Sequence, residues 1–279
     1  MPVTFDVRGY ARTAQGSLRG ELDLDAIALS PRALAARETI ATLAELEGAT
    51  MTHLRNVLVT STHKDARVTA FLVSWAYEKY WIADALRRIS GAGPAEAVGA
   101  GRVGTAPVGA GPGPVRRALA GFVQGPDIVG AHLALGQVDD LVLDLAYERL
   151  QHDAETGADE DSGDDAEVGG DGAADVVVAT LGGAVARIRS IKARHSAFFE
   201  GETRSRLAGS ARASRLARRE LRRSAWPLGA AAVTKAERLA LVRFAVPTRD
   251  RRERLAHDIR SVPGLDRRTA DAVVRRLGA

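Results

Sequence analysis

Apolar residues recur at helical spacing along four long stretches of this 279-residue chain, and this periodicity constrains its fold more than any other feature. Side chains three and four positions apart lie on one face of an α-helix, so such a stripe marks the face that a helix buries. The stripes predict helices over roughly residues 31–60, 62–89, 127–152 and 174–223. Ala and Leu, which lose little side-chain freedom in a helix, dominate the composition. We therefore expect an all-α protein.

The segments around these helices differ in composition and divide the chain. Residues 1–30 are expected to be an irregular N-terminal segment, because Gly9, Gly16 and Gly20 interrupt any period. Residues 31–225 are expected to form a helical bundle, and residues 226–279 a basic tail of short helices. Those short helices are predicted over residues 234–246, 249–261 and 267–277.

Two segments inside the predicted bundle have no helical pattern. Residues 91–114 form a linker rich in Gly, Pro and Ala, and residues 153–175 carry ten acids and no base. We expect the acidic segment to be a disordered loop, because it is highly charged and offers almost nothing to bury. The long linker falls between the second and third long helices. A crossover connection at this point is typical of one class of four-helix bundle.

Composition excludes several functional classes. The chain has no cysteine, so disulfides, thiolate metal sites and cysteine nucleophiles are ruled out. The sequence contains no run of about 18 apolar residues, so no membrane span is expected. Met1–Arg12 lacks the apolar core of a signal peptide. The expected location is the cytoplasm.

Charge is distributed unevenly along the chain. The net charge is +4, but residues 204–279 hold 20 basic and 7 acidic residues, a local balance of +13. A charge of this size can attract an anionic partner, whereas the simpler interpretation is a solvated basic face balanced by the acidic segment.

Ionisable residues fall on the predicted buried stripe of each long helix. Glu47 is in register with Leu43 and Leu54, and Glu78 is in register with Trp75 and Ile82. Asp140 continues the stripe of the third helix, and His195 continues that of the fourth, with Lys192 one turn earlier. A buried charge is costly unless it is paired or bound to metal. Two alternatives remain: a one-residue error in helix phase, which would turn these groups to solvent, and a salt-bridge network without chemistry.

Four segments, in order, resemble the helices of ferritin-like di-iron carboxylate proteins. These segments are LAELEGATMTHLR (43–55), TAFLVSWAYEKYWIADAL (69–86), GQVDDLVLDLAYERL (136–150) and IRSIKARHSAFFEGETRSRL (188–207). The resemblance implies a ferritin-like four-helix bundle with a crossover connection. In that family, two helices each supply one carboxylate and two supply Glu-x-x-His, and the six groups bind two irons.

Carried onto this sequence, the resemblance implies an incomplete site. Glu47, Glu78, Asp140 and His195 match four of the six metal ligands. Trp81 stands at the position of the second-helix histidine, and Lys192 at that of the fourth-helix glutamate. A lysine ammonium repels metal ions but can neutralise carboxylates. We therefore expect a remnant site in which Lys192 forms salt bridges and Trp81 fills the vacated volume. A single iron or manganese bound by the four remaining groups is the alternative.

Three functions follow from these patterns. The first is a non-catalytic scaffold or binding protein without a cofactor, with a homodimer among its expected assemblies. The second is a di-iron-type oxidoreductase with an altered site. The third is nucleic-acid binding through residues 204–279, where Val262–Leu265 and the helices around it resemble a helix-hairpin-helix element. A structural hairpin that packs on the bundle is the favoured interpretation of that element, because Asp266 replaces its second glycine and would repel phosphate.

Overall fold

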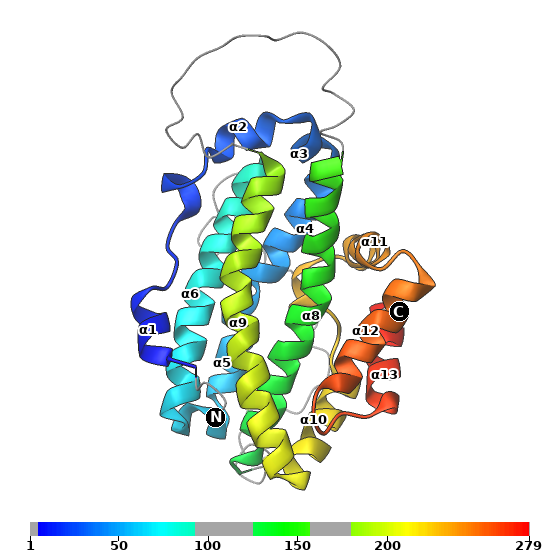
Figure 1. Cartoon of the computed structure of the whole chain (residues 1–279). Coiled ribbons are helices and arrows are strands. Elements are labelled where there is room, and N and C mark those ends of the chain that lie inside the picture. The colour runs from blue at the N-terminus through cyan, green and yellow to red at the C-terminus, as the bar shows by residue number, and fades with distance from the viewer. Residues whose placement is uncertain (1–4, 93–124, 157–179, 279) are drawn as a thin grey trace.

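The computed structural model describes residues 5–92, 125–156 and 180–278, and every regular element among them is helical. Figure 1 shows long helices packed side by side, with the C-terminal helices on one flank. The prediction of an all-α protein is confirmed. Most of the 91–114 linker and of the 153–175 acidic segment lies outside the described residues.

The first two long helices differ from the prediction in their boundaries. The helix expected over 31–60 is three helices, α3 (Pro31–Ala35), α4 (Arg37–Gly48) and α5 (Thr50–Leu58). The second break follows Gly48, where Arg87 packs so closely that a Cβ atom would lie 2.5 Å from its Nη2. Helix α6 (Ala66–Ile89) begins four residues later than expected, because Asp65 is its N-cap and accepts a hydrogen bond from Val68 N.

The remaining long helices are α8 (Asp127–Thr156) and α9 (Leu181–Gly209). The stretch predicted as one helix over 174–223 is interrupted after Gly209, because Ser210 leaves the helical conformation and caps α10 (Ala211–Arg223). The start expected near residue 174 lies outside the described residues.

Three contacts define the directions of the helices. Arg37 Nε, at the start of α4, lies 2.6 Å from the Ser90 carbonyl oxygen at the end of α6. Arg32 Nη1 lies 2.7 Å from the Ala154 carbonyl oxygen near the end of α8. At the other end of the bundle, Ser210 Oγ lies 2.6 Å from Asp127 at the start of α8. Helices α6 and α8 therefore run in one direction, and α4, α5 and α9 run in the opposite direction.

The N-terminal segment, expected to be irregular, contains three short helices: α1 (Val7–Arg12), η1 (Leu18–Gly20) and α2 (Leu24–Leu29). All three, α1, η1 and α2, pack against α6. Their buried residues Tyr10, Leu18 and Ile27 anchor them to the bundle, which the glycine count alone could not indicate.

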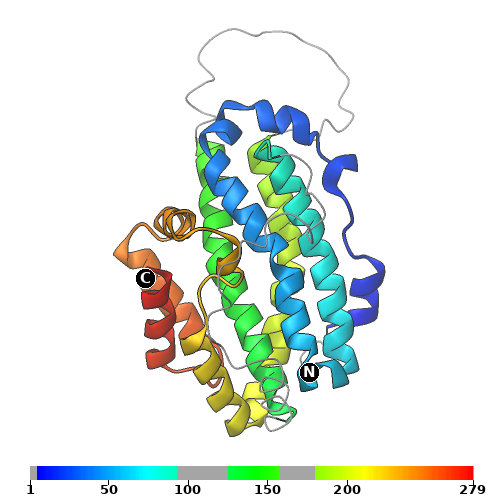
Figure 2. The same ribbon diagram turned by 180° about the vertical axis from the view of Figure 1, so that it is seen from behind.

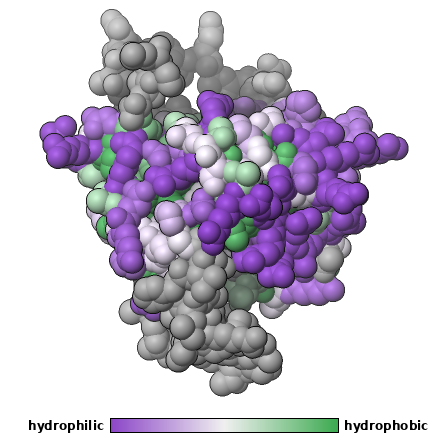
Figure 3. Space-filling model, turned by 90° about the horizontal axis from the view of Figure 1, so that it is seen from below, coloured by the Kyte–Doolittle hydropathy of each residue, from purple (hydrophilic) through white to green (hydrophobic). Residues whose placement is uncertain are grey.

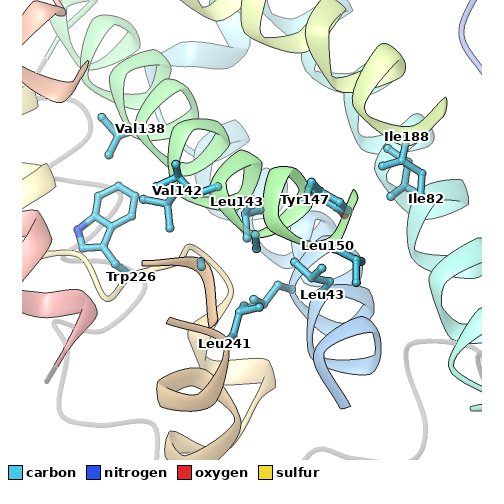
Figure 4. Close-up of a cluster of buried hydrophobic side chains, with 14 of the residues drawn as sticks. Leu43, Ile82, Val138, Val142, Leu143, Tyr147, Leu150, Ile188, Trp226 and Leu241 are labelled. Atoms are coloured by element: carbon cyan, nitrogen blue, oxygen red, sulfur yellow. The ribbon is translucent and has the colours of Figure 1, made fainter. Parts of the chain in front are cut away.

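The C-terminal helices agree closely with the prediction: α11 (Lys235–Ala245), α12 (Arg249–Ser261) and α13 (Arg267–Leu277). They pack on α8 and α10 around Trp226, which is fully buried. Figure 4 shows how α8 joins the two parts of the core, with Val138 and Val142 near Trp226 and Leu150 near Leu43. A continuous apolar core thus extends from the bundle into the C-terminal helices.

Candidate functional site

All four residues predicted as metal ligands lie inside the bundle. The exposed fractions are 0% for Glu47 and His195, 1% for Glu78 and 3% for Asp140. They come from α4, α6, α8 and α9, so each of the four main helices contributes one. Each helix buries its polar residue because that residue shares a face with apolar side chains that must leave water. The four residues do not form one cluster: they divide into two groups with different partners.

The first group contains two carboxylates and two ammonium groups. Lys192 Nζ lies 3.1 Å from Glu47 Oε1 and 3.0 Å from Asp140 Oδ1. Lys79 Nζ forms an ion pair with the other oxygen, Glu47 Oε2, and both side chains are buried. The Tyr147 hydroxyl donates a hydrogen bond of 2.9 Å to Glu47 Oε1. Two positive charges therefore balance two negative charges in the centre of the bundle.

The second group surrounds Glu78. Its Oε2 accepts hydrogen bonds from the Tyr10 hydroxyl at 2.5 Å and from His195 Nε2 at 2.7 Å. Its Oε1 accepts a hydrogen bond of 2.6 Å from the Gln15 backbone N–H and forms an ion pair with Arg194. Helix α1 and the loop after it thus supply part of this group, and each oxygen of the Glu78 carboxylate has two partners.

The electrostatics favour charged carboxylates and a neutral histidine. Burial alone would raise the pKa of Glu47, but the nearby ammonium groups of Lys192 and Lys79 hold it at about 2. Burial lowers the pKa of Lys192, yet Asp140 and Glu47 outweigh it and the net shift is upward. Burial also lowers the pKa of His195, against the opposing hydrogen bond to Glu78. At neutral pH His195 is therefore an uncharged donor to Glu78.

The sequence predicts Trp81 in the vacated volume, but the structure puts Lys79 beside Glu47. Trp81 is half-buried, and its ring lies against Tyr77 and Tyr80, which are 48% and 44% exposed. Lys79 was not among the predicted site residues, although the sequence pattern indicates that it is buried. It lies four residues after Trp75 and three before Ile82, on the same buried stripe. Tyr10 was missed because it belongs to the segment expected to be irregular.

A fifth buried acid, Asp139, connects the charged interior to the C-terminal helices. Its Oδ1 accepts a hydrogen bond of 2.7 Å from the Leu228 backbone N–H, just after Trp226 and Pro227. Burial raises the pKa of Asp139 to about 7, although the charges of Lys79 and Lys192 oppose this shift. Asp139 is therefore a group whose charge changes near neutral pH.

These residues do not suit a dinuclear metal site. A pair of divalent cations needs an excess of carboxylate charge, whereas both carboxylates of the first group already have ammonium partners. Among the described residues, no three His, Asp or Glu side chains are grouped closely enough to hold a metal ion. Asp140 Oδ2 and His195 Nδ1 are buried without a hydrogen-bond partner in the described part of the chain.

Comparison with known proteins adds no family. The chain matches no family model, no curated protein and no solved structure. Of the helices that the structure describes, none is both long enough and apolar enough to cross a membrane.

Proposed function

We propose that this chain is a ferritin-like bundle protein in which salt bridges occupy the place of the metal ions, and that it acts as a non-catalytic scaffold or binding protein. The observation that carries the proposal is the position of Lys192 Nζ, about equally far from Glu47 and Asp140. An ammonium group between two carboxylates from different helices takes the place that a bridging cation would need.

The helix directions support the ferritin-like part of the proposal. Helices α6 and α8 are consecutive among the described helices and run in the same direction, which requires a crossover connection between them. Helices α4 and α6 pack as one antiparallel pair and α8 and α9 as another. Ferritin-like bundles combine two such pairs in this way.

The charge balance supports the non-catalytic part. Glu47 and Asp140 face Lys79 and Lys192, and Glu78 faces Arg194. Three carboxylates therefore meet three cations, and an added divalent ion would leave an uncompensated positive charge in a buried site. Such a charge costs several kcal/mol, of the order of 3–5 when one member of a buried pair is unmatched.

A di-iron-type oxidoreductase with an altered site is the second candidate. It is favoured by the burial of all four residues that match the family's ligands, of which Glu78 and His195 are in direct contact. Metal content distinguishes the two functions.

The test is elemental analysis of the full chain expressed in iron- and manganese-supplemented medium. We expect no metal above trace in the wild type. Lys192→Glu removes the central ammonium and places a carboxylate three residues before His195, so this variant is expected to retain metal. Lys235→Glu, which makes the same charge change at an exposed site, is the matched control and should stay metal-free. About two irons per wild-type chain would overturn the proposal in favour of the oxidoreductase.

A further inference from the structure

Helix α10 presents a continuous row of arginines on its outer side. Its inner face buries Ala213, Ala217 and Leu221 against the bundle. Arginines occupy six of its thirteen positions, and helical spacing puts all of them on the opposite side: Arg212, Arg215, Arg218, Arg219, Arg222 and Arg223. Seen from this end of the bundle, most of the described surface is hydrophilic (Figure 3).

Helix α13 lies beside α10 and runs in the same direction. Near the start of α13, Arg218 Nη1 donates a hydrogen bond of 2.8 Å to the Gly264 carbonyl oxygen. At its end, Arg276 Nη1 lies 3.5 Å from the Ser224 carbonyl oxygen. Figure 2 shows the two helices together on the flank of the bundle. Their outward side chains therefore contribute to one surface.

Six arginines on these two helices are exposed and form no ion pair with an acidic side chain of the described residues, although the charge of Arg222 helps to lower the pKa of Asp266. They are Arg215, Arg222, Arg223, Arg268, Arg275 and Arg276, which we call the arginine surface. Neighbouring arginines do have such partners: Arg218 pairs with Asp266, and Arg219 with Glu220. Arg222 and Arg276 also donate to backbone carbonyls, which orients the side chains without neutralising the charge.

The chemistry of this surface fits a polymer of phosphates. A guanidinium group binds phosphate through two parallel hydrogen bonds. Helix α10 is thirteen residues long, about 20 Å at 1.5 Å per residue. One strand of a nucleic-acid duplex carries about six phosphates over that length, at 3.4 Å each.

Other anionic partners fit this surface less well. The exposed large apolar side chains of the described residues all lie between residues 29 and 80, and none is on α10 or α13. The arginine surface therefore offers nothing to insert into a lipid layer. It also lacks exposed aromatic rings on which the bases of a single strand could stack.

We propose that the arginine surface of α10 and α13 binds the phosphate backbone of double-stranded nucleic acid without reading its sequence. The turn between α12 and α13 is not the phosphate-binding element, because the Gly264 carbonyl and Asp266 are both held by Arg218. This proposal does not depend on metal content, so it can fail while the proposed function stands.

The test is fluorescence anisotropy of the full chain with a labelled 20-base-pair duplex of arbitrary sequence, between 50 and 200 mM salt. A log–log slope of about −3.6 to −5.4 is expected, from four to six phosphate contacts at about −0.9 each. The triple variant Arg222→Ala, Arg223→Ala, Arg275→Ala should flatten the slope by about 3 and weaken binding at least tenfold.

The control triple variant is Arg8→Ala, Arg12→Ala, Arg55→Ala, which removes the same charge from exposed sites elsewhere on the bundle. It should change affinity less than twofold, and circular dichroism should show that both triples keep the wild-type helix content. A slope near zero for the wild type, or equal weakening by both triples, would overturn the proposal. Tighter binding to a single strand of the same length, or binding only to anionic phospholipid vesicles, would also overturn it.

Discussion

Replacement of Lys192 by methionine tests whether the charged interior is what stabilises this bundle. Methionine has a similar length and volume but no charge, so the substitution removes the ammonium without leaving a large cavity. Glu47 keeps Lys79 and Tyr147 as partners, whereas Asp140 loses the only cation within ion-pair distance among the described residues. Removal of one partner from a buried ion pair costs about 3–5 kcal/mol.

A loss of that size is a large part of the 5–15 kcal/mol that stabilises a typical domain. It corresponds to a fall in Tm on the order of 10 °C for a chain of this length. The assay is urea unfolding of the wild type and of Lys192→Met at pH 8, followed by circular dichroism.

Two further variants complete the test. Lys192→Met combined with Asp140→Asn removes both charges and should recover more than half of the lost free energy, since the two residues are in contact and their effects are not additive. Lys235→Met changes an exposed lysine and should cost less than about 0.5 kcal/mol. If Lys192→Met unfolds within 1 kcal/mol of the wild type at pH 8, the buried salt-bridge network does not exist in solution.

Four other substitutions have defined outcomes. Folding raises the pKa of Asp139 from 3.8 to about 7, so its ionisation opposes folding above pH 4. Asp139→Asn should therefore add stability that grows between pH 4 and 7, to the order of 4 kcal/mol at pH 7. Parallel pH profiles of stability for the two proteins would contradict this. Tyr10→Phe removes a hydrogen bond to the buried Glu78 carboxylate and should lower the free energy of unfolding in urea by about 1.5–3 kcal/mol. An unchanged free energy would mean that α1 is detached from the bundle in solution. A Cβ atom at Gly136 would lie 2.5 Å from the Phe199 ring, so Gly136→Ala should destabilise the protein by about 1–3 kcal/mol. Gly201 on α9 faces open space, so Gly201→Ala should stabilise the protein by up to about 1 kcal/mol. A Gly136→Ala protein as stable as the wild type would show that α8 and α9 pack less closely.

The sequence by itself determined the all-helical class, the C-terminal helices and the burial of one ionisable group on each main helix. These features depend on periodicity, and a stripe of apolar residues defines a helix face wherever the helix finally packs. Glu47, Glu78, Asp140 and His195 were found for this reason. Helix boundaries were less certain, because capping by Asp65 or Ser210 depends on the conformation of one residue.

Only the tertiary structure decided which of these buried groups meet. Glu47 and Glu78 occupy equivalent places in the sequence pattern, yet the first contacts two lysines and the second contacts Tyr10 and His195. The pairing depends on how far each helix is rotated and shifted against its neighbours, and a one-dimensional pattern does not contain these quantities. The same reason explains why Lys79, rather than Trp81, is the side chain beside Glu47. It also explains why the N-terminal segment supplies part of the site: its buried anchors have partners only once α6 and α9 are in place.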